Sequence, residues 1–358
     1  MNKIAYKLCL FSIVFAVGVL ASSCFQNGHH PPGPTLVPPP SPPEEEVPPE
    51  AINLRTSLHS NARGMEYWYE QDDGFGSMSG VAYETAGCGT CHVNVTTCND
   101  CHNDEKGKEP VAQPDSCLKC HGRLGKTNAL QLTDLHMQAG MVCSDCHSSG
   151  DIHGDGTAYT SLFEPGAIDA KCENCHESLP DNPQHAKHAD DLTCMACHTS
   201  SVITCYNCHF QTLIDKHEKK AAAAFKDFVM LVNNAEGKVT TASYQSVYYQ
   251  GKGFVAVGPY QAHTTVAKGR TCSDCHNNSR VRELNDTGEI KVAWWDDEEG
   301  KLKHASGVIP FVPDKLKFQF VDLDPEGNWV PVEPDEFRLQ YEFCTPLSEE
   351  QLSALGVQ

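Results

Sequence analysis

The sequence has few basic and few aromatic side chains for its length. Lysine and arginine number 27 against 47 acidic residues in 358, which gives a formal net charge of -20, and aromatic residues make up 8% of the chain. Because binding to a phosphate backbone needs a basic face, this balance excludes a nucleic-acid partner. The shortage of aromatic residues, with 22 prolines, predicts a thin side-chain core that something else must fill. No glycine-rich phosphate loop is present.

What the sequence has in excess is cysteine and histidine. Of 19 cysteines, 16 fall into eight C-x-x-C-H motifs. Two thiols at this spacing can form thioethers to both vinyl groups of one porphyrin, and the adjacent histidine then binds the iron. A zinc or disulfide scaffold gives no reason for a histidine after every second cysteine. The sequence therefore predicts eight c-type haems, on Cys88, Cys91 and His92; Cys98, Cys101 and His102; Cys117, Cys120 and His121; Cys143, Cys146 and His147; Cys172, Cys175 and His176; Cys194, Cys197 and His198; Cys205, Cys208 and His209; and Cys272, Cys275 and His276.

The histidines outside the motifs match the number of irons. His29 and His30 lie in a proline-rich stretch, which leaves eight candidates for the second axial position, namely His59, His136, His153, His185, His188, His217, His263 and His304. This equality predicts that every iron binds two imidazoles, and that it exchanges electrons but does not bind substrate. His185 and His188 would share a face of a helix. Either they bind two neighbouring haems, or only one of these two histidines is a ligand. His59 and His304 lie far from any motif.

The N-terminal 50 residues predict export and a tether. Residues 1–23 carry two lysines and then an apolar run too short to span a membrane, which is typical of a signal peptide. Cys24 follows in a lipoprotein-like cleavage site, so we expect it to be lipidated; if it is not, it can pair with Cys344. Residues 24–50 are rich in proline, which favours an extended spacer.

Motif density guides the expected fold. The eight motifs occupy residues 88–276, too little chain to wrap each porphyrin separately. We expect a loop-rich multihaem cytochrome c fold, with short α-helices around a stacked haem core, a small β insertion and an irregular or β-rich C-terminal region. Residues 51–220 would form a domain with seven haems, and residues 221–358 would hold the β insertion, the eighth haem and the C-terminal region. Within these, residues 216–228 read as helix, residues 229–260 as strands, and residues 348–355 as a capped helix.

These motifs resemble those of the multihaem c-type cytochromes that metal-reducing bacteria place in the periplasm and on the outer surface, among them octahaem outer-membrane lipoproteins. The resemblance covers roughly residues 59–276 and is most evident from Cys172 through His185 and His188 to His209. It implies a continuous chain of haems, histidine at both axial positions and, in some members, polymerisation into filaments.

The expected function is electron transfer. Saturated irons held close together predict a relay between other redox proteins, such as cytochromes, and an extracellular acceptor such as a metal oxide; a filament subunit is the narrower version. The protein would be exported and lipid-anchored at the outer membrane, facing the periplasm or the cell surface. The alternative is an enzyme similar to octahaem reductases of nitrite, hydroxylamine or tetrathionate, which keep one haem open or lysine-ligated.

Overall fold

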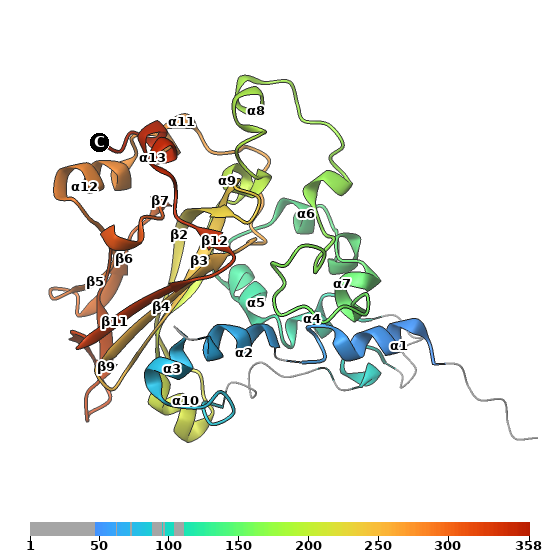
Figure 1. Cartoon of the computed structure of the whole chain (residues 1–358), viewed down its shortest axis with the longest axis horizontal. Coiled ribbons are helices and arrows are strands. Elements are labelled where there is room, and N and C mark those ends of the chain that lie inside the picture. Colours follow the sequence, from blue (N-terminus) through green and yellow to red (C-terminus); the bar gives the residue numbers. More distant parts are fainter. Residues whose placement is uncertain (1–46, 62, 72–73, 88–94, 96, 104–110) are drawn as a thin grey trace, which may run out of the picture. The chain divides into compact units, whose positions relative to one another are not determined.

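The computed structural model describes residues 47–61, 63–71, 74–87, 95, 97–103 and 111–358. The first C-x-x-C-H motif and the predicted signal, lipidation site and linker up to residue 46 therefore lie outside the described residues. The helices are α1 (Pro49–Asn53), α2 (Arg63–Glu70), α3 (Phe75–Ser79), α4 (Asp115–Leu118), α5 (Gly122–Ala129), α6 (Leu135–Gln138), α7 (Ser149–His153), α8 (Pro183–His188), α9 (Cys194–His198), α10 (Phe210–Lys216), α11 (Cys272–Cys275), α12 (Ser279–Thr287) and α13 (Glu349–Leu355) (Figure 1).

A mixed seven-stranded sheet organises the C-terminal half of the chain. Its order is β11-β4-β3-β1-β2-β12, with β7 added to β2. β1 pairs antiparallel with β2 and parallel with β3, so it is an interior strand of the sheet. The strands are β1 (Val202–His209), β2 (Ala221–Asn234), β3 (Val239–Tyr249), β4 (Lys252–Pro259), β5 (Ile290–Asp296), β6 (Lys301–His304), β7 (Gly307–Pro310), β8 (Leu316–Phe318), β9 (Phe320–Leu323), β10 (Trp329–Val332), β11 (Glu336–Tyr341) and β12 (Cys344–Thr345).

The apolar core lies against this sheet. The largest fully buried side chains include Tyr206, Phe225, Phe228, Tyr244 and Phe320, and their rings contact one another. Tyr206 and Phe225 are stacked with ring centres 4.9 Å apart. The aromatic residues are few, but these rings are concentrated on the neighbouring strands β1, β2 and β3 and on β9, where burial of apolar surface stabilises the fold.

The predicted loop-rich fold around a stacked haem core is wrong. The seven-stranded sheet is far larger than a small insertion, and the apolar core packed against it consists of side chains. The predicted helix over residues 216–228 is also wrong, because α10 ends at Lys216 and β2 begins at Ala221. The alanines there favour a helix locally, but pairing with β1 satisfies their backbone groups in an extended conformation instead.

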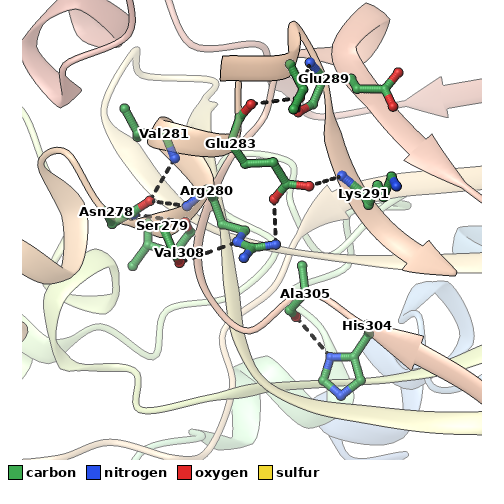
Figure 2. Close-up of polar contacts among 11 residues, drawn as sticks. Asn278, Ser279, Arg280, Val281, Glu283, Glu289, Lys291, His304, Ala305 and Val308 are labelled. Carbon is green, nitrogen blue, oxygen red and sulfur yellow. Dashed lines mark hydrogen bonds and ion pairs between the residues drawn. The ribbon is translucent and has the colours of Figure 1, made fainter. Parts of the chain in front are cut away.

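Local turn and cap signals were more informative. The turn between β2 and β3 contains Gly237 at a φ of 80°, a conformation that glycine adopts without strain. The predicted C-terminal helix is confirmed as α13, in which Ser348 and Gln351 form a capping box and Gly356 ends the helix. α12 begins at the cap residue Asn278, and Glu283 on this helix joins Arg280 to the backbone of Lys291 on β5 (Figure 2).

The position of Leu231 gives a test of the side-chain core. Leu231 is 3% exposed on β2, so Leu231→Ala leaves a cavity and is expected to lower the free energy of unfolding by about 2–5 kcal/mol. Leu179→Ala is the matched control, since Leu179 is 50% exposed and its loss should change stability by less than about 0.5 kcal/mol. Denaturant unfolding followed by far-ultraviolet circular dichroism measures both; equal effects would contradict this core.

Candidate haem-binding sites

Six of the C-x-x-C-H motifs form the same compact turn. In five of them the backbone N–H of the histidine donates to the carbonyl of the first cysteine at 2.8–2.9 Å, and the sixth, Cys194–His198, is helix α9 itself. A helical turn places residues i, i+3 and i+4 on one side. The two thiols and the imidazole therefore lie on the same side of the turn, which is the arrangement needed for all three to bind one planar ligand. The five turns are those ending at His102, His121, His147, His176 and His276.

Each of these six motif histidines faces one histidine from outside the motifs. The pairs, with the distances between ring centres, are His121 with His59 (6.1 Å), His102 with His153 (6.2 Å), His176 with His136 (6.1 Å), His147 with His263 (6.3 Å), His198 with His185 (6.2 Å) and His276 with His188 (6.2 Å). In every case the partner comes from another segment, at least 13 residues away along the chain. His185 and His188 serve different partners, so one helix, α8, contributes to two sites.

The ring separations provide a test of fit. Since a metal–imidazole bond is about 2.0 Å long and a ring nitrogen lies ~1.1 Å from its ring centre, two imidazoles on opposite faces of one metal have centres ~6.3 Å apart. The observed 6.1–6.3 Å matches this value, whereas stacked rings in direct contact can approach more closely, as His304 and Phe225 do at 4.4 Å. The six pairs therefore fit a metal ion held between two imidazoles.

Contacts at Nδ1 orient several of these rings. The Nδ1 of His198 lies 2.9 Å from the carbonyl oxygen of Val266, and that of His276 lies 2.7 Å from the carbonyl oxygen of Ala354. Further Nδ1 partners are Asp151 for His147 (3.3 Å), Ser149 for His153 (2.9 Å) and the Pro180 carbonyl for His185 (3.0 Å). A carbonyl or carboxylate partner makes Nδ1 the protonated nitrogen, which leaves Nε2 as the metal-binding atom.

Burial keeps several of the rings neutral. The pKa of His59, of His121 and of His263 is lowered first by burial and then by neighbouring imidazoles. The pKa of His188 is lowered in the same way, with His276 as the main neighbour. Metal binding requires a neutral imidazole, so the environment favours the ligand form of these four side chains.

Asp134 connects two of the sites, although sequence reasoning did not single it out. Its carboxylate caps α6 by accepting from the backbone N–H of His136 at 2.9 Å, and it also accepts from the N–H of Thr265 at 2.8 Å. Burial opposes the charged form, but these hydrogen bonds together lower the pKa of Asp134. Asp134 thus fixes the segment of His136 against that of His263. An aspartate one residue before a helix was the available signal.

The six motifs follow one another in space. The pKa of Cys101 is raised first by burial, then by Asp100 and Cys120, which indicates that the second and third motifs are close. The pKa of Cys117 is likewise raised by burial and then by Cys143, that of Cys146 by burial and then by Cys175, and that of Cys275 by burial and then by Cys197, while a hydrogen bond with Cys194 lowers the pKa of Cys172. Neighbouring thiols therefore link these six motifs in sequence order, and the sixth adjoins the eighth.

Two further predicted axial ligands occupy different environments. The Nδ1 of His217 lies against Gly87, where an added Cβ would be 2.3 Å away, so the side chain adjoins the last described residue before the first motif. The His304 ring stacks on Phe225, and its Nδ1 lies 2.9 Å from the carbonyl oxygen of Ala305 (Figure 2). Within the described ranges His304 has no ring contact with another histidine. It borders a shallow pocket of about 400 Å³ with Trp294.

The seventh motif differs from the other described motifs. Cys205–His209 is the C-terminal half of strand β1, and the backbone N–H of His209 donates to Lys220, not to Cys205. The His209 ring faces Trp329 at 6.1 Å, and its Nε2 lies 3.4 Å from a carboxylate oxygen of Asp322. No second imidazole faces His209 among the residues that the structure describes. This motif does not fit the arrangement of the six pairs.

The remaining thiol is isolated from solvent. Cys344 is 7% exposed, and its pKa is raised to about 12 by burial and by the nearby charge of Glu342. Its alternative partner Cys24 lies outside the described residues. In the part of the chain that the structure describes, no group of three or more histidine, cysteine or acidic side chains could hold a metal ion. The six sites each offer two protein ligands, which is the number a porphyrin-bound iron takes.

No described helix is both long enough and apolar enough to cross a membrane.

Comparison with known proteins adds no relative to these observations. No family model, no curated protein and no solved structure matches this chain. The interpretation of the sites therefore rests on the motifs, the ring separations and the contacts at Nδ1.

Proposed function

We propose that this protein is a multihaem c-type cytochrome that relays electrons. The observation that carries the proposal is the set of six histidine pairs, each joining a C-x-x-C-H histidine to one outside the motifs at 6.1–6.3 Å. A zinc site would need four protein ligands in a tetrahedron, and each of these sites offers two opposed imidazoles. When bound, haem supplies one-electron chemistry at its iron.

The chain's own residues hold and shield the sites. The two cysteines of each turn would anchor the porphyrin edge, and the paired imidazoles would occupy both axial positions, so that no position remains for substrate. Anchors such as the Val266 and Ala354 carbonyls fix ring orientation. The lowered pKa of His59 and of His263 favours the neutral imidazole that an iron would bind. This arrangement supports electron exchange without bond-making to a substrate.

The spatial order of the motifs supports a relay. Thiols that influence one another's pKa link the second, third, fourth, fifth, sixth and eighth motifs in order, and the N–H of Arg270, two residues before the eighth motif, donates to the carbonyl of Cys197 at 3.1 Å. An electron entering at one end would pass neighbouring sites in turn. The net charge of -20 would attract cationic redox partners and make association weaker at high salt.

The proposal also covers the partners that exchange electrons with this protein and its location in the cell. Partners of this class are other cytochromes, and the terminal acceptor is an extracellular metal oxide or a similar oxidant, with self-association into a filament as the narrower version. Export and lipid anchoring at Cys24 would place the protein at the outer membrane. The proline-rich segment after Cys24 would hold the folded part away from the lipid surface.

One observation favours the alternative of a reductase. Such an enzyme needs an iron with one coordination position open to substrate. Among the described motif histidines, His209 lies beside Asp322 and Trp329, whereas the other six lie opposite an imidazole. If a haem were attached there, it would lack a second histidine. Carbon monoxide binding to the reduced wild-type protein separates the two functions, because a relay with saturated irons binds none.

The axial pairs can be tested one at a time. His263→Ala removes the partner of His147 and should convert one iron per molecule from low spin to high spin, with carbon monoxide binding at that iron after reduction. His304→Ala is the control, since His304 stacks on Phe225 and should leave all spectra unchanged. Electron paramagnetic resonance and absorption spectra provide the measurement. A high-spin signal from His304→Ala, with none from His263→Ala, would reverse this assignment.

The contact between Asp151 and the Nδ1 of His147 should influence the midpoint potential of the haem bound by His147. Asp151→Asn removes a negative charge 3.3 Å from that nitrogen, which makes the ferric state less favourable. We expect the midpoint potential of one haem to rise by roughly 50 mV, close to a tenfold change in a one-electron equilibrium. Asp155→Asn, on an exposed side chain, is the control and should not shift it. Spectroelectrochemical titration resolves the difference, and identical titration curves would rule out this role.

The lipid anchor has a separate test. Cys24→Ser removes the thiol to which lipid would attach, so the protein should move from the membrane fraction to the soluble fraction. Cys344→Ser controls for loss of a thiol outside the motifs, and it should leave the distribution unchanged. Immunoblotting of fractionated cells measures both. Retention of the Cys24→Ser protein in membranes would reject the tether.

A further inference from the structure

The seventh C-x-x-C-H segment is built as an interior strand. Cys205 pairs with Ala224 and Cys208 with Ala221 in one unbroken antiparallel register, while Cys208 also pairs with Val247 on the other side. Asn207, between the two cysteines, has a φ of 52°, so the segment departs locally from an extended strand while it keeps its pairing with β2. The two cysteines are thus held by pairing with neighbouring strands and not by a turn within the motif.

The hydrogen bond that defines those turns is also absent here. The N–H of His209 is used by the carbonyl of Lys220 at 2.8 Å, at the point where β1 meets the start of β2. In the six turns the equivalent N–H bonds within the motif. Forming such a turn at Cys205–His209 would require this half of β1 to leave both β2 and β3.

The two residues between the cysteines are part of the core. Tyr206 is fully buried, and its hydroxyl donates to the carbonyl of Gln319 at 2.9 Å. Asn207 is 1% exposed and makes two hydrogen bonds to the backbone of Val321, donating at 2.7 Å and accepting at 3.0 Å. In the second, fifth and eighth motifs the intervening residues are exposed. Moving this segment would therefore expose a buried ring and leave backbone groups of the neighbouring β9 without partners.

The side chain of His209 contacts the hairpin formed by β9 and β10. Its Nδ1 lies 2.6 Å from the hydroxyl of Thr212, and its Nε2 lies 3.4 Å from a carboxylate oxygen of Asp322. Trp329 meets the imidazole with ring planes at 78°. A metal bound to His209 and to a second imidazole would need the space beside the His209 ring. The carboxylate of Asp322 and the indole of Trp329 occupy that space.

The series of neighbouring motifs also bypasses this segment. The backbone N–H of Arg270, two residues before the eighth motif, donates to the carbonyl of Cys197 in the sixth motif at 3.1 Å. The route through the described sites is thus continuous without the seventh motif.

We propose that Cys205–His209 is a structural strand that carries no haem, so that its two cysteines form no thioethers. The inference rests on the proposed function, since it concerns which motifs receive the cofactor. The segment joins the sheet to the β9–β10 hairpin through Tyr206, Asn207 and His209.

Peptide mass spectrometry of the wild-type protein tests this directly. Trypsin releases residues 188–216, which contain both the sixth and the seventh motif without an internal lysine or arginine, and residues 271–280, which contain the eighth. We expect one haem on each peptide, with fragmentation placing it on Cys194 and Cys197 and with iodoacetamide modifying Cys205 and Cys208. Two haems on the first peptide, or one haem on Cys205 and Cys208, would overturn the inference. Absence of haem from the second peptide would instead contradict the proposed function.

Paired variants give a second measurement. The double change Cys205→Ala and Cys208→Ala should leave the haem-to-protein ratio of the purified protein unchanged. The matched double change Cys272→Ala and Cys275→Ala should lower it by one equivalent. Pyridine haemochrome absorbance against protein concentration provides the ratio. Loss of one equivalent from the first variant would show that the strand carries haem.

Discussion

The separation between paired imidazoles is the constraint on which the described sites depend. The two rings of each pair come from different segments, such as α8 and α9 for His185 and His198. Their centres lie 6.1–6.3 Å apart only while both segments keep their places, so each site depends on the packing of two parts of the chain.

The sheet supplies rigidity to the end of the series. Thr199 and Thr265 form an isolated bridge, and the carbonyl of the next residue, Val266, lies beside the ring of His198. The backbone of Thr193, just before the sixth motif, donates to Val239 at the start of β3. The sixth site is therefore attached to a preformed side-chain core. The earlier described sites draw on loops and short helices.

Local spacing allowed the motif turns and the candidate axial histidines to be predicted, since both depend on residue type and position. The capped helix at Ser348 was predictable for the same reason. The pairing of His59 with His121, or of His188 with His276, was not, because it depends on tertiary contacts between distant segments. The large sheet was missed because a low aromatic content averaged over the whole chain conceals its concentration around Tyr206, Phe225 and Tyr244. The strand at Cys205 was missed because identical motif letters give no information on hydrogen bonding to Lys220.

Two of the paired histidines, His198 and His276, have a main-chain carbonyl at Nδ1. The Val266 and Ala354 oxygens belong to the peptide backbone, so almost any amino acid at these positions would leave the acceptor in place. Substitutions along these segments can therefore accumulate without disturbing the orientation of the two imidazoles, provided that the course of the backbone is kept. A protein organised in this way can drift far in sequence while the geometry of these histidine pairs stays the same.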